Sequence, residues 1–170
     1  MKVRAWWGQL RSFHHVGRTT LGAVASLGVA SLLTLREPYW AAITTLIVMQ
    51  SDLESTLTLS ARRLVGTALG AALGAVLLTS IGPTMPAFAL GVFVAGVACI
   101  VLGCVSKRLS GFVDRTAYRY AGITLAVIML IPHVPSIWTV ALDRFIEVSI
   151  GIVVALVVTK LWLGDPDKLA

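Results

Sequence analysis

Residues 37–74 read EPYWAAITTLIVMQSDLESTLTLSARRLVGTALGAALG, and this stretch decides the fold class. An apolar segment, 38–51, is followed by a polar connection and then by a second apolar segment that begins at residue 64. Aromatic, hydroxyl and cationic residues lie within or beside these segments, namely Tyr39, Trp40, Thr44, Thr45, Arg62 and Arg63. Such groups are costly in hydrocarbon, so by default they mark a pathway or a binding site there. The stretch therefore predicts a membrane protein that handles a small solute.

The composition of the whole chain agrees with a membrane location. Hydrophobic residues make up 57% of the 170 residues, charged residues 13%, and the mean hydropathy is +0.88. Soluble domains average roughly 25% charged residues. We therefore expect residues 1–170 to form one membrane domain without a soluble domain. Cys99 and Cys104 lack the spacing of metal ligands or of a disulfide framework, so we expect them to be packing residues, with no metal or cofactor.

Six apolar segments follow one another along the chain, which predicts an all-α membrane protein with six transmembrane helices. They cover residues 19–35, 38–51, 64–81, 86–106, 120–131 and 145–163. A helix needs about 20 residues, and at least roughly 17, to cross the hydrocarbon layer, so segments one, three, four and six are long enough. Segments two and five would span only ~21 Å and ~18 Å. These two either borrow flanking residues or are tilted, broken or sheltered by their neighbours.

The basic residues predict the orientation. If all six segments cross, twelve of the fourteen lysines and arginines share one side of the membrane, and only Arg36 and Arg144 lie on the other. The twelve are Lys2, Arg4, Arg11, Arg18, Arg62, Arg63, Lys107, Arg108, Arg115, Arg119, Lys160 and Lys168. By the positive-inside rule both termini are cytoplasmic. The net charge of +6 is thus a topology signal and does not indicate nucleic acid. Four spans with two re-entrant segments would give the same orientation.

The basic residues 1–18 suggest an N-terminal segment in the inner membrane interface. Trp6, Leu10 and Phe13 fall at i, i+4 and i+7, as in a short amphipathic helix lying in that interface. An ordinary basic tail is the alternative. A cleaved signal peptide is disfavoured, because the following apolar run is long and no small-residue cleavage site follows it.

The two halves of the chain resemble one another. Trp40-Ala-Ala-Ile-Thr44 aligns with Tyr120-Ala-Gly-Ile-Thr124, and Arg63 with Gly70 aligns with Arg144 and Gly151, at an offset of 80 or 81 residues. Each half has three segments, an odd number, so a true repeat would be inverted. Inverted repeats are frequent in transporters, where short segments at corresponding positions indicate the substrate site. Here those are segments two and five.

Small residues recur at four-residue spacing in three segments. They are Gly22, Ser26 and Ala30, then Gly66, Gly70 and Gly74, and then Ala87, Gly91 and Ala95. Such stripes let helices approach closely in a membrane. They leave open whether the contacts form within one chain or between subunits. Because six short helices enclose little volume, we expect a homo-oligomer, most simply a homodimer.

The motif of residues 37–74 resembles a known family. Tyr39-Trp40-Ala41 with Thr44, then Thr56-Leu57 and Arg63-x-x-Gly66-Thr67-x-x-Gly70, is similar to the signature of the fusaric-acid-resistance-like (FUSC) family. Arg144-x-x-Glu147-x-x-x-Gly151 resembles its second conserved segment. The family includes aromatic acid exporters and is similar to the aluminium-activated malate transporters of plants. The resemblance implies a six-helix module of the bacterial inner membrane, commonly dimeric, that moves organic anions. Many relatives carry a further domain that this sequence lacks.

Several residues suit an organic anion. Arg63 can hold a carboxylate through its planar guanidinium, and we expect the start of the third helix to add the positive end of a helix dipole. Tyr39 and Trp40 can stack on an aromatic ring, and Thr44, Thr45 and Thr124 can supply hydroxyl contacts. The alternatives are structural: arginines that anchor the inner interface, aromatic residues of the outer belt, and a threonine that bonds its own helix.

Glu147 is the carboxylate placed inside an apolar segment, one turn after Arg144. The arginine favours the ionised carboxylate and burial favours the protonated acid, so the pair is a candidate for proton coupling at the outer end of the last helix. The alternative is a fixed ion pair.

Two functions therefore remain open. The first is a transporter or channel for small organic acids, with efflux as the expected direction; the second is a non-transporting membrane subunit of a larger complex. An enzyme is not expected, because no catalytic constellation occurs and the histidines are dispersed at 14, 15 and 133.

Overall fold

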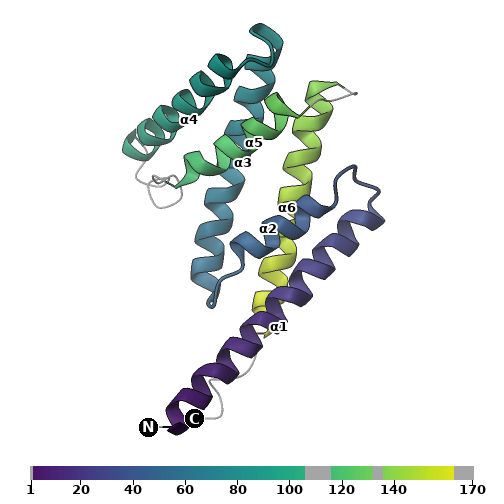
Figure 1. Ribbon diagram of the computed structural model, residues 1–170, viewed down its shortest axis with the longest axis vertical. Coiled ribbons are helices and arrows are strands. Elements are labelled where there is room, and N and C mark those ends of the chain that lie inside the picture. The colour runs from purple at the N-terminus through teal and green to yellow at the C-terminus, as the bar shows by residue number, and fades with distance from the viewer. Residues whose placement is uncertain (1, 106–115, 132–135, 163–170) are drawn as a thin grey trace. The chain divides into compact units, whose positions relative to one another are not determined.

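The computed structural model describes residues 2–105, 116–131 and 136–162. These residues form six α-helices and, within the described ranges, no strand (Figure 1). The helices are α1 (Lys2–Leu32), α2 (Tyr39–Val48), α3 (Leu53–Ser80), α4 (Met85–Val105), α5 (Ala117–Leu130) and α6 (Ile137–Trp162). The prediction of an all-α chain with six helical segments is confirmed at this level.

The chain divides into two compact units. Unit 1 comprises Met1–Leu57 and Ile150–Ala170, and unit 2 comprises Thr58–Ser149. The boundaries fall inside two helices, so α3 and α6 each contribute to both units. Each unit is described by itself below.

Two helices begin earlier than hydropathy predicted. The apolar segment was expected to begin at residue 64 after a polar connection, yet α3 begins at Leu53, where the Asp52 carboxylate accepts the backbone N–H of Ser55 at 2.7 Å. This is an N-cap, and it satisfies an otherwise orphaned donor of the first turn. α6 begins at Ile137, not after Arg144. Helix formation follows backbone hydrogen bonding and capping, which tolerate the charged residues that interrupt a hydropathy run.

The first helix also differs from the expected segment. α1 is continuous from Lys2, so residues 2–18 run without a break into the apolar part. It ends at Leu32, where Thr34 adopts a positive φ of 53° and the Leu35 N–H donates to the Ala30 carbonyl. This is the bonding pattern of a Schellman motif. The side chains of Trp6 and Leu10 lie outside the described residues, as do Lys107, Arg108, Arg115, His133 and Lys168.

Unit 1 is built on a hairpin of α1 and α2. The two helices lie side by side (Figure 1). Gly22 of α1 faces Thr45 and Met49 of α2, and the buried Arg18 guanidinium donates to the backbone carbonyl of Gln50. The start of the apolar part of α1 and the end of α2 therefore lie at the same end of the hairpin, as two antiparallel crossings require.

Unit 2 is built on close contact between α3 and α5. A Cβ atom added at Gly66 would collide with the backbone of Ala117, and one added at Gly70 would collide with that of Ala121. Gly74 meets Ile128 further along both helices, so α3 and α5 run in the same direction. The glycine stripe of α3 thus packs within the chain, which answers the question that spacing alone left open.

The remaining helices of unit 2 complete its core. Gly91 of α4 meets Leu77 and Leu125 near one end, and Cys99 of α4 packs with Ala117 near the other, so α4 runs antiparallel to α5. Val140 and Ala141 of α6 pack with Ala71 and Ile128. Buried alanines and glycines keep these helices close, as in other membrane bundles.

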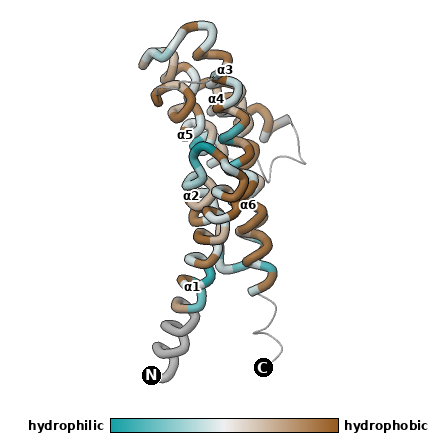
Figure 2. Tube along the Cα trace, turned by 90° about the vertical axis from the view of Figure 1, so that its right-hand side faces the viewer, coloured by the Kyte–Doolittle hydropathy of each residue, from teal (hydrophilic) through white to brown (hydrophobic). Residues whose placement is uncertain are grey.

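Three helices, α3, α4 and α6, are long and apolar enough to cross a membrane among the described residues. Hydrophobic residues dominate α6 in Figure 2. The expected shortness of segments two and five is confirmed, since α2 has 10 residues and α5 has 14. Segment one was expected to span by itself, but α1 is not among the three. The helix stops at Leu32 and not at residue 35, so its apolar part is shorter than expected. At its other end this apolar part continues, without a break in the helix, into the polar residues around Arg18.

Candidate functional site

Arg63 is the most unusual side chain of unit 2. It lies on α3 with only 1% of its surface exposed, and its guanidinium carbon sits 5.0 Å from the centroid of the Tyr120 ring on α5. Within the described part of the chain, its Nε and Nη1 atoms are buried without a hydrogen-bond partner. A cation over an aromatic face is favourable, but it leaves the N–H groups unsatisfied. The site therefore presents a buried, unneutralised positive charge with free donors.

The position of Arg63 corrects one expectation about its electrostatics. α3 begins at Leu53, ten residues before Arg63, which places the arginine ~15 Å along the helix axis. Helix-dipole effects decline within the first turn. The positive end of α3 therefore does not assist Arg63, and the guanidinium itself provides the charge.

Two hydroxyl residues flank Arg63 on the same face of α3. Ser60 and Thr67 are 3% and 0% exposed, and within the described chain neither hydroxyl has a hydrogen-bond partner. The positions 60, 63 and 67 are spaced i, i+3 and i+7, which places them on one side of a helix. The family resemblance included Thr67 only as part of a motif, and Ser60 was not singled out.

The unpartnered hydroxyls stand out against the rest of the chain. A serine or threonine in a helix commonly donates to a carbonyl three or four residues earlier. Among the described residues, hydroxyls that do so include those of Thr19, Thr20, Ser26, Thr45, Thr56, Thr79, Thr124 and Ser149. Thr44, Ser60, Thr67 and Thr159 are buried and do not. Their hydroxyls are available to another partner.

The three predicted threonines therefore differ. Thr45 is occupied, because its hydroxyl lies 3.1 Å from the Ala41 carbonyl and 2.9 Å from the Gly151 carbonyl. Thr124 is occupied as well, since it donates to the Tyr120 carbonyl at 3.2 Å. The alternative for Thr44 was a hydrogen bond within its own helix. Its hydroxyl is instead buried without a hydrogen-bond partner in the described chain.

The aromatic pair at the start of α2 is more accessible. Tyr39 is 49% exposed, and its ring centroid lies 6.0 Å from that of Trp40. The Trp40 indole N–H donates to the Glu37 carboxylate at 3.0 Å. Both roles proposed for this pair, stacking on a ring and anchoring at the interface, are compatible with an amphipathic side chain at a helix end.

Arg144 and Glu147 form a buried ion pair on α6. Arg144 Nη1 donates to Glu147 Oε2 at 3.1 Å, and the two residues are 5% and 0% exposed. Because α6 begins at Ile137 and not after Arg144, Glu147 lies about 15 Å from the start of the helix and not in its first turn. In the alignment of the two halves, Gly66 stands where Glu147 stands after Arg144. Arg144 thus has an acidic neighbour one turn on, and Arg63 does not.

The predicted residues fall into two groups. Thr44, Thr45 and the Tyr39–Trp40 pair belong to unit 1, and Gly151 joins this group through its contact with α2. Unit 2 holds Arg63, Thr124, Arg144 and Glu147, with Tyr120 between Arg63 and Thr124. Among the described residues no three histidine, cysteine, aspartate or glutamate side chains gather as a metal site.

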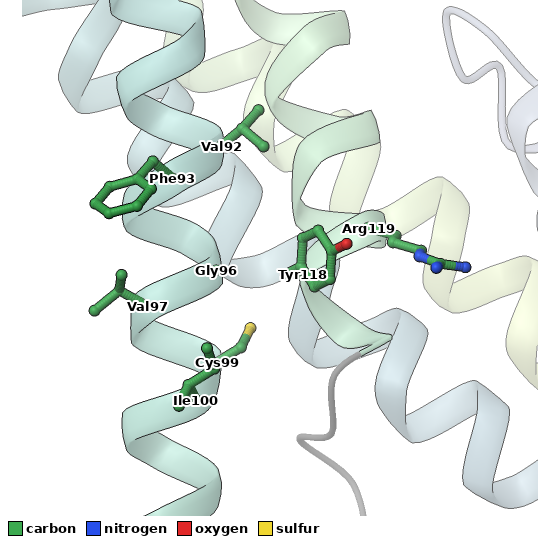
Figure 3. A pocket seen from close by; sticks show the side chains of 8 residues that line it. All are labelled: Val92, Phe93, Gly96, Val97, Cys99, Ile100, Tyr118 and Arg119. Carbon is green, nitrogen blue, oxygen red and sulfur yellow. The ribbon is translucent and has the colours of Figure 1, made fainter.

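A groove on unit 2 lies away from these residues. It has a volume of about 720 Å³ and runs between α4 and the start of α5 (Figure 3). Its lining residues are Val92, Phe93, Gly96, Val97, Cys99, Ile100, Tyr118 and Arg119. The predicted site residues are not among them, and the α4 side of the groove is apolar.

Comparison with known proteins identifies the family. Residues 19–158 match the family model described as fusaric acid resistance protein-like. The chain belongs to this family. The resemblance drawn from residues 37–74 and from the Arg144–Gly151 segment is therefore confirmed, and the match covers both units. Arg63 and the Arg144–Glu147 pair all lie inside the matched region.

Two curated relatives within this FUSC family are similar over most of the chain. Each is an uncharacterized transporter named YdhK, one from Escherichia coli strain K12 and one from Escherichia coli O157:H7. Both are 30% identical over 149 residues, which cover 84% of this chain and 21% of the relative. The chain thus spans about a fifth of the length of these relatives. No solved structure matches the chain.

Proposed function

We propose that this FUSC-family chain is a membrane module that transports small organic anions, with Arg63 as the residue that holds the anion. The observation that carries the proposal is the buried guanidinium with two unpartnered nitrogens. An isolated buried charge is costly, and pairing with an opposite charge relieves that cost. A carboxylate suits the planar donor fork of arginine. An arriving anion would therefore supply the partner that the described chain does not.

The names of family and relatives support the same class of function. The family description refers to resistance to an organic acid, and both relatives are named transporters. Efflux from the cytoplasm of a bacterium through its inner membrane, with both termini cytoplasmic, fits a resistance role. Tyr39 and Trp40 would offer aromatic surfaces to a ring-bearing acid along the route, and Thr44 a free hydroxyl.

The proposed architecture is two inverted repeats of three helices. Its support is a reciprocal contact. Gly70 packs against the backbone of Ala121, and Gly151 packs against the backbone of Ala41. In the alignment of the two halves Gly70 corresponds to Gly151 and Ala41 to Ala121. Each half thus supplies the glycine for one contact and the alanine for the other, as a repeated unit would.

A homodimer is the proposed assembly. The glycine stripe of α3, Gly66, Gly70 and Gly74, packs against α5 within unit 2, so we propose that the subunits contact one another through another surface. Crosslinking in native membranes tests this, and a functional monomer would contradict it.

A non-transporting membrane subunit is the second candidate. In this alternative the apolar helices α3, α4 and α6 serve to hold the chain in the membrane beside a partner. Such a subunit would need a partner chain before any solute moves.

A flux assay separates the two candidates. The purified chain in liposomes should move radiolabelled benzoate, chosen as a simple aromatic carboxylate, faster than protein-free liposomes do. Inhibition by excess unlabelled benzoate would show a saturable site. Flux equal to that of empty liposomes would reject transport by this chain alone.

Glu147 is the proposed proton-coupling residue, with Arg144 as its partner. An anion that draws Arg144 away would leave a buried carboxylate that gains from taking up a proton. Glu147→Gln should therefore abolish benzoate accumulation driven by a pH gradient while sparing exchange of benzoate down its own gradient. A variant that still responds fully to the pH gradient, or one that loses exchange together with folding, would return the pair to a structural role.

A further inference from the structure

Three buried polar side chains on one face of α3 have polar atoms without a hydrogen-bond partner, and they form the strongest unexplained cluster in the described chain. They are Ser60, Arg63 and Thr67, each at least 97% buried. We propose that Ser60 and Thr67 complete the anion site around Arg63, and that this site selects a singly charged carboxylate over a doubly charged one. The inference rests on the proposed function and adds to it two donor residues and the charge of the substrate.

The hydroxyls are placed to serve the same ligand as the guanidinium. Ser60 and Thr67 lie one turn to either side of Arg63, so the three residues form a strip ~10.5 Å long on one helix face. A carboxylate accepts hydrogen bonds at about four lone-pair sites, and a guanidinium fork occupies only two of them. Hydroxyl donors on both sides can satisfy the others. This explains why these two hydroxyls are not bonded to their own helix.

The charge of the site sets the charge of its ligand. In unit 2 the described basic residues besides Arg63 are Arg62, Arg119 and Arg144. Arg144 is paired with Glu147, Arg119 is exposed, and Arg62 is half-buried with interactions of its own. Among the described basic residues of unit 2, Arg63 is therefore the one that is fully buried without a carboxylate partner. A monoanion would balance it, whereas a dianion would bring a second negative charge into the same dry surrounding without a partner.

The described neighbours of Arg63 in unit 2 are an aromatic ring and the backbone of α5. The Tyr120 ring contacts the Arg63 guanidinium. On the adjoining side of α3, the backbone of α5 occupies the space beside Gly66 and Gly70. The described carboxylates of unit 2 are Asp143 and Glu147, and both belong to α6. Each residue of the strip on α3 can donate a hydrogen bond and none carries a negative charge, as expected for a site that binds an acceptor-rich anion.

Equilibrium binding to the purified full chain tests the inference with two probes that share a benzene ring. Benzoate carries one carboxylate, and phthalate carries two and is a dianion at neutral pH. The unmodified chain should bind benzoate at least about tenfold more tightly than phthalate, the factor expected when one charged hydrogen-bonded group is left unpaired. Equal or tighter binding of phthalate would overturn the charge selection, and this comparison requires no variant.

Substitutions then test the two hydroxyls. Ser60→Ala and Thr67→Val should each weaken benzoate binding by roughly tenfold, because each removes one donor to a charged acceptor. Thr67→Ser keeps the hydroxyl and should restore binding. Thr79→Val on the same helix is the matched control, since its hydroxyl is bonded to the Ala75 carbonyl, and it should bind benzoate normally.

The outcomes separate this inference from the proposed function. In one outcome the unmodified chain binds benzoate and Arg63→Gln abolishes this binding, while Ser60→Ala and Thr67→Val bind as tightly as the unmodified chain. The anion site at Arg63 then stands, and the role of the two hydroxyls is refuted. If the unmodified chain binds neither probe, the proposed function fails and this inference fails with it. Should Thr67→Val not fold, the Ser60→Ala variant and the two-probe comparison still decide.

Discussion

At the scale of single residues, the least predictable property was which hydrogen-bond partner, if any, each buried hydroxyl has in the described chain. Thr44 and Thr45 are neighbours in one helix, both fully buried, and sequence reasoning gave them the same role. The structure bonds Thr45 to the carbonyls of Ala41 and Gly151 and leaves Thr44 without a partner in the described chain. The difference includes a hydrogen bond to a residue 106 positions away in sequence, which no local pattern predicts. For Arg63 the sequence left two roles open, an anion contact and an interface anchor, and it did not predict that only 1% of the residue is exposed.

Adjacent substitutions in α2 should therefore have opposite effects on stability. Thr45→Val removes a buried hydroxyl that donates across to α6 and should lower the free energy of unfolding by about 1 kcal/mol. Thr44→Val replaces an unsatisfied buried hydroxyl with a methyl group and should leave stability unchanged or raise it. Thermal unfolding of the two variants in the same detergent measures the difference. A larger loss for Thr44→Val than for Thr45→Val would contradict these assignments.

At the scale of helices, the sequence predicted six segments and the shortness of α2 and α5, and it misplaced the starts of α3 and α6. Both errors have one cause. The predicted segments followed hydropathy, and polar residues such as Glu54 and Asp143 interrupted the apolar runs. The backbone continues as a helix through them because Asp52 caps α3 and because Arg144 and Glu147 neutralise one another inside α6. Close helix contacts were predictable as stripes, but the partner helix was not.

The glycines of α3 and α1 provide a matched test of helix contact. Gly70→Ala places a methyl group against the backbone of Ala121 and should destabilise the chain by about 1–3 kcal/mol. Gly28→Ala, in α1, meets no atom within 4 Å and should stabilise the helix by roughly 0.5–1 kcal/mol. Both values come from unfolding in detergent. If Gly70→Ala were as stable as Gly28→Ala, the described contact between α3 and α5 would be wrong.

At the scale of the whole molecule, the sequence established the family, and charge placement predicts the topology. The family assignment was accessible because the motif of residues 37–74 is contiguous and the family model covers residues 19–158. Crossing of the membrane by α1, α2 and α5 remains a prediction. The antiparallel hairpin of α1 and α2, fixed by Arg18 on the Gln50 carbonyl, agrees with paired crossings.

Reporter fusions should place both termini in the cytoplasm, because twelve of the fourteen basic residues fall on that side in the predicted topology. A reporter inserted at Gly82, where φ is +90° and the chain turns between α3 and α4, should read as external. A cytoplasmic N-terminus together with an external C-terminus would exclude every topology with an even number of crossings.

The central claim is that Arg63 holds the transported anion, and benzoate flux through Arg63 variants tests it most directly. Arg63→Gln removes the charge, and Arg63→Lys keeps the charge but loses the planar fork. Both should reduce saturable flux at least about tenfold at unchanged protein level, whereas a residue that only anchors the helix would tolerate lysine, which snorkels as well as arginine. Arg62→Gln, the adjacent and less buried arginine, is the matched control and should retain flux. Wild-type flux in both Arg63 variants, or an equal loss in Arg62→Gln, would contradict the account.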